Sequence, residues 1–294
     1  MELILNLTQY DYLDFINSRV NTIQIGLANF CVGYLKTYTI DDLPAIIKKI
    51  HLANKKVYLS VNIIANEHQI EIFQKDIKKL KSLNIDGFVI ADFGIFQILK
   101  EENLTSKIVF NPVTNVTNKY ASEIANNFGI DHCCLANELN IKDILEIIEY
   151  TNGNVELLAQ GYYQICNSKR ALLTNFFKKN KLKNNSKHYY IKEENRDYAY
   201  PILEINGETI IYIDKQRCIL PYFKQLSSTS LKYIRIDSTF LSIDELNKHI
   251  NCYNNILSDI NTLDTEIENI QSYSNSNLKC LDSISILKKE KKNA

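Results

Sequence analysis

The feature that most constrains the fold of this chain is a regular alternation of short apolar runs with longer amphipathic segments, which continues to about residue 255. Short β-branched runs are typical of buried strands, and apolar residues at every third or fourth position are typical of helices. This order predicts successive strand–helix units on a parallel sheet. The eight predicted strands are Leu3–Asn6, Thr22–Gly26, Lys56–Asn62, Gly87–Ala91, Lys107–Asn111, His132–Leu135, Val155–Ala159 and Tyr233–Asp237.

The amphipathic segments between these runs predict the connecting helices. The clearest are Ile40–Ala53, Glu67–Leu83, Ile141–Tyr150 and Asp244–Leu257. Parallel strands need crossovers, and eight similar crossovers close most simply into a ring. We therefore predict an α/β fold, a (β/α)8 TIM-like barrel. A doubly wound sheet is the alternative, although no GxGxxG or Walker-type loop follows any predicted strand.

The spacing of the strands also predicts how the chain is divided. We expect a barrel domain over residues 1–257, with an insertion at the barrel rim over about 161–230, between the seventh and eighth strands. Within it, Pro201–Ile205 and Thr209–Ile213 flank the turn Asn206–Gly207, which predicts a hairpin. Residues 258–294 are rich in Asn and Ser and end in a charged run, so we expect a weakly helical or disordered tail.

Charge and cysteine content exclude several classes of protein. Lys and Arg total 34, as do Asp and Glu, so no overall field attracts nucleic acid or a membrane. The N-terminus lacks the basic region of a signal peptide, and no apolar run approaches the length of a membrane span. The seven cysteines are scattered and form no CxxC motif. We expect a cytoplasmic protein with reduced thiols and no contact with a membrane.

In a barrel of this type, residues at the carboxyl ends of the strands converge on the active site. The candidates at or just beyond those ends are Asn62, Asp92, Asn111, Glu138, Gln160, Tyr162 and Asp237. Among them, Asp92, Glu138 and Asp237 are the predicted catalytic residues. Asp92 could instead cap the helix Phe93–Lys100, and Asp237 could shape a turn with Ser238 and Thr239.

Metal and nucleophile motifs are absent from the sequence. The five histidines have no partner at metal-ligand spacing, and a strand at His132-Cys133-Cys134 would direct the middle residue away from the other two. We therefore predict no metal site. No GxSxG, HExxH or Cys/His pattern supplies a hydrolytic nucleophile either.

A basic segment with aromatic residues lies in the predicted insertion. Between Lys169 and Lys187 it contains Phe176 and Phe177, and Tyr189 and Tyr190 follow. Basic side chains neutralise phosphates and aromatic rings stack on bases, so the segment suits single-stranded RNA. A solvated loop with a small hydrophobic anchor is the alternative.

Two longer stretches resemble peptidase family U32, the collagenase-like proteases. They are QGYYQICNSKRALLTNFF (160–177) and ENRDYAYPILEINGETIIYIDKQRCILPYFKQL (194–226), and KKVYLSVN, DGFVIADFGIF and LANELN upstream fit as well. The chain is most similar to the short bacterial members that are paired with a longer relative. The resemblance implies a (β/α) barrel that acts in tRNA modification, with prephenate-dependent 5-hydroxylation of the wobble uridine as the expected reaction.

The resemblance also implies particular site residues. Lys169, Arg170, Asn175 and Arg196 match the family pattern and are expected to bind substrate or an anion, either a prephenate carboxylate or an RNA phosphate. A guanidinium fork suits both anions. Asp237 is expected to orient a substrate hydroxyl or an arginine. For Arg170 and Arg196, a salt bridge to a nearby acid is the alternative.

Departures from the family pattern limit what can be transferred. Gln160 stands where members usually have histidine, Gln164 stands at a cysteine position, and of the cluster-type cysteines only Cys218 matches. We therefore expect no iron–sulfur cluster and no bound cofactor in this chain. Three functions stay open: a tRNA-hydroxylating enzyme or subunit, a peptidase, and a non-catalytic partner in a hetero-oligomer with a longer paralogue.

Overall fold

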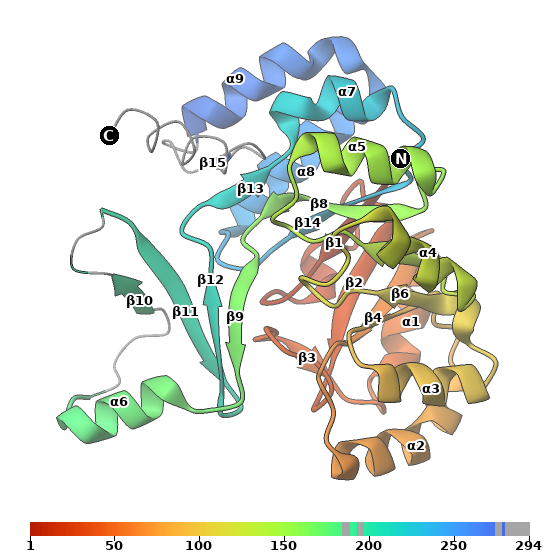
Figure 1. The fold of residues 1–294 in the computed structure, drawn as a ribbon, viewed down its shortest axis with the longest axis vertical. Helices are drawn as coiled ribbons and strands as arrows, with labels where there is room; N and C mark the ends of the chain where they lie inside the picture. The colour runs from red at the N-terminus through yellow and green to blue at the C-terminus, as the bar shows by residue number, and fades with distance from the viewer. Residues whose placement is uncertain (184–188, 193, 195–196, 274–277, 280–294) are drawn as a thin grey trace.

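Eight parallel strands close into a barrel in the computed structural model (Figure 1). The structure describes residues 1–183, 189–192, 194, 197–273 and 278–279. Neighbouring strands follow the order β14-β1-β2-β4-β5-β6-β7-β8, and β14 also pairs with β8, which closes the ring. The predicted (β/α)8 TIM-like barrel is thus confirmed, and each predicted run coincides with one barrel strand. These are β1 (Glu2–Asn6), β2 (Thr22–Leu27), β4 (Lys56–Val61), β5 (Gly87–Ile90), β6 (Ile108–Phe110), β7 (His132–Cys134), β8 (Val155–Gly161) and β14 (Tyr233–Asp237).

Helices cover the outside of the barrel and begin where the sequence supplies caps. Asn66 and Gln69 form a capping box at the start of α2, and Ser242 and Glu245 form one at α8. The first connection holds only the 3-10 helix η1 (Tyr12–Asp14), and the short strand β3 (Thr37–Tyr38) pairs with β2. The outer helices are α1 (Leu43–Leu52), α2 (Glu67–Ser82), α3 (Phe93–Glu101), α4 (Lys119–Asn127), α5 (Ile141–Tyr150) and α8 (Ile243–Ser258), with η2 (Thr105–Lys107) before β6.

The interior of the barrel changes character along its axis. Successive strand residues point alternately inward and outward, so the outward set packs on the helices in one large apolar cluster. Inside, a second cluster of Ile4, Tyr58, Val89, Val109 and Cys134 fills the middle. Toward the carboxyl ends the inward side chains are polar, and this polar end forms the site described below.

The segment between β8 and β14 forms a separate antiparallel sheet beside the barrel (Figure 1). Its order is β10-β11-β12-β9, with β9 (Gln164–Ser168), α6 (Leu172–Asn180), β10 (Tyr189–Lys192), β11 (Ala199–Ile205) and β12 (Glu208–Tyr212). We call this segment, residues 164–212, the rim module. The predicted hairpin is present as β11 and β12, and both turn residues, Asn206 and Gly207, have positive φ. The chain then returns through β13 (Gln216–Cys218), which pairs antiparallel with β8, η3 (Leu220–Tyr222) and α7 (Phe223–Ser227).

After α8 the chain folds back along that helix. The 3-10 helix η4 (Ile260–Thr262) leads into α9 (Leu263–Tyr273), whose Leu263 and Ile270 are buried. The two-residue strand β15 (Leu278–Lys279) pairs with β13. The first part of the predicted tail is therefore helical, and residues 280–294 lie outside the described residues. The described helices include none that is both long enough and apolar enough to span a membrane.

Candidate functional site

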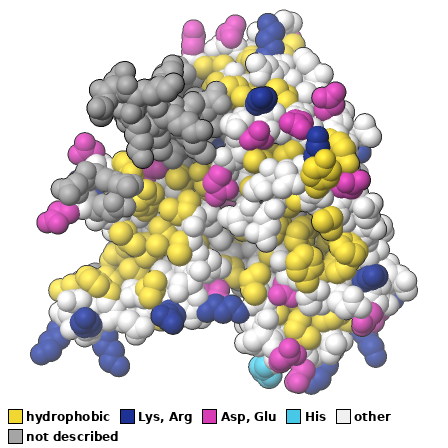
Figure 2. Space-filling model, in the orientation of Figure 1, with side chains coloured by type: hydrophobic (Ala, Val, Ile, Leu, Met, Phe, Trp, Pro, Cys, Tyr) yellow, Lys and Arg dark blue, Asp and Glu magenta, His cyan; other side chains and the backbone are white. Residues whose placement is uncertain are grey.

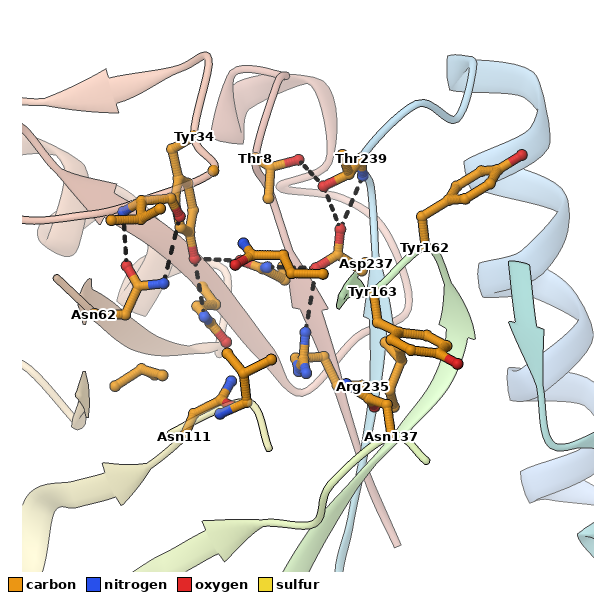
Figure 3. Close-up of a pocket in the computed structure, with 18 of the residues that line it drawn as sticks. Thr8, Tyr34, Asn62, Asn111, Asn137, Tyr162, Tyr163, Arg235, Asp237 and Thr239 are labelled. Atoms are coloured by element: carbon orange, nitrogen blue, oxygen red, sulfur yellow. Dashed lines mark hydrogen bonds and ion pairs between the residues drawn. The ribbon is translucent and has the colours of Figure 1, made fainter. Parts of the chain in front are cut away.

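A small polar cavity lies at the carboxyl ends of the barrel strands (Figure 3). Its volume is about 60 Å³, which is room for only a few water molecules. Barrel strands and their loops supply most of the lining, and the rim module adds Gln164 and Tyr212. The polar lining residues from the barrel and its loops are Asn6, Thr8, Gln24, Tyr34, Asn62, Asn111, Asn137, Tyr162, Tyr163, Arg235, Asp237 and Thr239.

Asp237, at the end of β14, is held by four donors. Its Oδ2 accepts hydrogen bonds from Asn6 Nδ2 at 2.8 Å and from Arg235 Nη1 at 3.2 Å. Its Oδ1 accepts from the backbone N of Thr239 at 2.9 Å and from the Thr239 hydroxyl at 2.6 Å. Gly161 packs so closely that a Cβ there would stand 2.7 Å from the Asp237 carbonyl oxygen. The carboxylate is thus a fixed, buried negative charge in the cavity wall.

Below Asp237 a chain of buried charges crosses the inside of the barrel. Arg235 Nε donates to Glu156 Oε1 at 2.6 Å, and the other carboxylate oxygen of Glu156 lies 3.4 Å from His132 Nε2. His132 Nδ1 lies 2.7 Å from Asp131, and its ring stacks on Tyr233 with 4.0 Å between ring centroids. Each buried charge in this chain therefore has an opposite charge as a neighbour, as burial requires.

These contacts shift the pKa values of the network. Burial alone would raise the pKa of Glu156, but the hydrogen bond to His132 and the charge of Arg235 outweigh it and lower that pKa to about 2. Burial alone would lower the pKa of His132, but its hydrogen bonds to Asp131 and Glu156 raise it above the usual value. The pair therefore favours a carboxylate facing an imidazolium.

A neutral network around Tyr34 completes the inner wall. Its hydroxyl donates to Asn6 Oδ1 at 2.6 Å and accepts from Gln24 Nε2 at 2.9 Å, and Ser60 Oγ lies 2.5 Å away. Burial raises the pKa of Tyr34 far above its ordinary value, so the phenol stays protonated. Asn6 joins this network to Asp237, so the two halves of the wall are fixed together.

Comparison with known proteins identifies the family to which this chain belongs. The sequence model described as Peptidase family U32 matches residues 10–285. The chain belongs to this family. It is 23% identical over 233 residues to a protein of Bacillus subtilis named "tRNA hydroxylation protein P2", an alignment that covers 77% of this chain and 75% of that protein.

A second family relative is longer than this chain. A Helicobacter pylori protein named "tRNA hydroxylation protein P" is 23% identical over 214 residues, which cover 69% of this chain and half of that protein. Among solved structures, a chitinase from Rhizomucor miehei aligns with 85% of this chain and 99% of its own at 11% identity, with a TM-score of 0.46. The fold assignment rests on the closed ring of strands and not on that structure.

Several of the predicted strand-end residues of this family member do meet at the cavity. Asp237, Asn62, Asn111 and Tyr162 line it together. Asn62 Oδ1 accepts a hydrogen bond from the backbone N of Val32 at 3.0 Å, which fixes the loop after β2. The role predicted for Asp237 stays a prediction, and its position in the cavity lining beside Arg235 is compatible with that role.

The other two predicted catalytic residues lie outside the cavity. Asp92 is the N-cap of α3: its Oδ1 accepts from the backbone N of Gly94 at 2.7 Å and of Ile95 at 3.0 Å, and its Oδ2 accepts from Ala65 N at 3.2 Å. Asp92 therefore caps α3, which is the alternative to a catalytic role that the sequence also allowed. Glu138 is exposed in the loop after β7 and does not line the cavity.

The predicted anion-binding residues belong to the rim module. Lys169 and Arg170 are exposed at the turn between β9 and α6, and Lys169 Nζ donates to the carbonyl of Ile64 across the rim. Asn175 is exposed on α6. Among the described residues Arg170 has no ion pair, and Arg196 lies outside the described residues. Their roles in binding stay predictions.

The described residues do not bring together the cysteines that an iron–sulfur cluster would need, and the absence of a cluster from this chain stays a prediction. In the described part of the chain, no group of three or more His, Cys, Asp or Glu side chains could hold a metal ion. Cys218, which matches the family pattern, is buried on β13, whereas Cys166 is exposed on β9. Gln160, at the family's histidine position, is buried and its Nε2 donates to Gln216 Oε1 at 2.7 Å.

The sequence reasoning missed the buried charges behind the cavity. His132, Glu156 and Arg235 each stand inside a run that otherwise reads as an apolar strand. The alternation of side chains along a strand could have revealed them. Leu158 on β8 and Asp237 on β14 line the cavity, and Glu156 and Arg235 stand two positions before them, so their side chains also point into the barrel. A charge at an inward position requires a partner across the barrel.

Proposed function

We propose that this protein acts in tRNA modification, as an enzyme or subunit for prephenate-dependent 5-hydroxylation of the wobble uridine. Membership of the family supports this proposal, together with similarity to proteins named for tRNA hydroxylation. Because those relatives are distant and one is about twice as long as the aligned region, substrate and reaction are proposals for this chain. A cytoplasmic location is part of the same proposal.

The main support for the proposal is that the rim module connects the polar cavity to a basic segment. β9 and β12 line the cavity, and the same module carries α6. Between residues 169 and 183 the sequence has the cations Lys169, Arg170, Lys178, Lys179, Lys181 and Lys183 and no acid. All six are exposed, and Figure 2 shows dark blue side chains gathered at the corner where Figure 1 places α6.

This concentration of charge matters because the whole chain is neutral. Cations gathered on one element attract phosphates by a field that is strong locally. Phe176 is 55% exposed on α6 and offers an apolar surface on which a base can stack. We infer that α6 binds the RNA backbone while the cavity receives the reacting groups.

A peptidase is not favoured. The described residues that line the cavity include no serine, cysteine or histidine. The two aliphatic hydroxyls of the lining, those of Thr8 and Thr239, bond to each other at 2.9 Å, and Thr239 also donates to Asp237. Within this described lining the one carboxylate is Asp237, and its ion pair with Arg235 makes it a weak base for activating a hydroxyl nucleophile.

A non-catalytic partner is the second candidate function. Two observations favour it: Gln160 replaces the family's histidine and is fully buried, and the cavity has a volume of only about 60 Å³. In this case the barrel and α6 would present tRNA to a longer paralogue in a hetero-oligomer. Co-purification of a longer family member with a tagged copy of this chain would support this candidate.

The direct test of the proposed function is nucleoside mass spectrometry of tRNA from a strain that lacks the gene. We expect nucleosides derived from 5-hydroxyuridine at the wobble position to disappear and to return with a plasmid copy. Unchanged levels in the deletion strain would contradict the proposal. Loss restored only when the longer paralogue is also present would favour the partner role.

A further inference from the structure

Arg217 is a buried arginine that forms no ion pair with the described residues. It lies on β13, its residue is 3% exposed, and Nη1 donates to the backbone carbonyl of Asn137. Nε is fully buried and has no hydrogen-bond partner. Within the described residues, that one bond is the only hydrogen bond of the guanidinium, and it forms no ion pair.

The contrast with Arg235 shows how unusual this is. Arg235 is buried in the same barrel and touches two carboxylates, those of Glu156 and Asp237. Among the described residues, the carboxylate whose charge acts on Arg217 is that of exposed Glu138, and the two side chains form no ion pair. Burial lowers the pKa of Arg217 to about 10. A buried cation without a partner destabilises a fold, so its presence calls for another reason.

The free edge of the guanidinium has the shape that a carboxylate needs. Nη1 uses one of its N–H groups on Asn137, whereas Nε and Nη2, whose N–H groups point in the same direction along one edge, have no partner among the described residues. A carboxylate binds these two donors side-on through two parallel hydrogen bonds. A neutral carbonyl oxygen would leave one of them unpaired, whereas a phosphate could also pair with both, so the burial of Arg217 decides between the two anions.

Arg217 stands directly behind one wall of the cavity. Its hydrogen-bond partner Asn137 lines the cavity, as does Tyr163, which feels the charge of Arg217, and both lie on the side of Arg235 (Figure 3). The cavity of about 60 Å³ is too small for a metabolite, since ligand pockets have volumes of about 300 Å³ or more. Tyr163 is only partly buried and is the cavity residue whose ring interacts electrostatically with Arg217, so it is the side chain that would have to move for a ligand to reach Arg217.

We propose that Arg217 binds a carboxylate of a small organic anion that enters the cavity when Tyr163 moves aside. This proposal rests on the proposed function and names the group that holds its small-molecule substrate. The ligand is a small molecule and not the RNA backbone, because a residue 3% exposed cannot meet a phosphate carried on a polynucleotide. Arg170, which is exposed, is the arginine that we expect to bind RNA.

The test is isothermal titration of the full-length protein with prephenate, and separately with malonate as a plain dicarboxylate. We expect Arg217→Gln to weaken binding of whichever probe the wild type binds by about tenfold to a hundredfold, the effect of removing a charged hydrogen-bonding pair. The control Arg19→Gln removes an exposed arginine of the loop before β2 and should leave affinity unchanged. Equal binding by Arg217→Gln, loss of binding in Arg170→Gln instead, or no binding of either probe by the wild type would overturn the proposal.

A second variant separates ligand binding from folding. Arg217→Met keeps the apolar stem and removes the unpaired charge, so its melting temperature without ligand should equal or exceed that of the wild type. The rise in melting temperature that prephenate gives the wild type should be absent. A large fall in melting temperature without ligand would instead make Arg217 a structural residue and overturn the proposal. Loss of the tRNA modification in the deletion strain is scored independently, so either idea can fail alone.

Discussion

Glu156 is the residue on which the buried charges of the barrel depend, because it touches both Arg235 and His132. Glu156→Gln would leave these two buried cations beside a neutral amide. We expect the free energy of unfolding, measured with urea, to fall by about 3–5 kcal/mol. Glu2→Gln is the matched control, since its pair with Lys56 is exposed and contributes about 1 kcal/mol or less. A similar effect of the two variants would contradict the network.

His132 gives the stability of the protein a predictable pH dependence. Its folded-state pKa is raised, so its contribution is complete below the unfolded pKa of about 6.5 and is lost as pH rises through the folded value. The contribution of Glu156, whose pKa is lowered to about 2, is complete above its unfolded value and is lost as pH falls toward 2. We expect the unfolding free energy of the wild type to decline as pH rises above about 6.5 and through the raised folded-state pKa of His132, and that of His132→Gln to decline less. Parallel curves for the two proteins would show that His132 does not titrate in this range.

At the scale of elements, a glycine where the barrel closes can be compared with a glycine in the rim hairpin. Gly153, before β8, has φ of 73°, and a Cβ there would stand 1.8 Å from the carbonyl oxygen of Ser230, before β14. Gly207 in the rim hairpin also has positive φ, but a Cβ there would meet nothing within 4 Å. Gly207→Ala should destabilise by about 1 kcal/mol. Gly153→Ala should cost at least about 2 kcal/mol more, because the backbone at the β8–β14 junction must shift; equal melting temperatures would contradict this.

Helix α6 is the element that should determine the affinity for RNA. Replacing Lys178 and Lys179 by Gln removes two exposed cations, so binding of tRNA should weaken most at low salt. The slope of log affinity against log salt should become shallower by up to about 0.7–0.9 for each phosphate that the variant no longer neutralises. The matched control is Lys48→Gln with Lys49→Gln on α1, a pair that is also exposed. An equal fall in affinity for both double variants would show that α6 has no special role.

At the scale of the whole molecule, the sequence predicted the barrel because its strands are apolar and regularly spaced. The rim module was predicted only in part. β11 and β12 carry a clear turn at Asn206–Gly207, whereas β9 has the sequence QICNS, is mostly exposed, and shows no alternation that could mark it as a strand. Its pairing with β12 is a tertiary contact that no local pattern records.

The same limit applies to the site. The rule that strand ends converge found Asp237, Asn62 and Asn111, because topology alone places them. It also selected Asp92, whose carboxylate is taken up by the start of α3, since a residue after a strand can equally cap the next helix. Glu156 was missed because its partner Arg235 is far away in the sequence, and Arg217 was missed because the sequence does not show that its Nε lacks a hydrogen-bond partner.

We propose that this barrel acts in tRNA hydroxylation through the cavity whose wall includes Asp237. The most direct measurement is the level of hydroxylated wobble uridine, by nucleoside mass spectrometry, in the deletion strain carrying wild type, Asp237→Asn or Glu2→Gln. Asp237→Asn removes the charge that Arg235, Asn6 and Thr239 hold in place. We predict full restoration by wild type and by Glu2→Gln, and restoration far below these by Asp237→Asn at equal protein level. Full restoration by Asp237→Asn, or modification that persists without the gene, would contradict the claim.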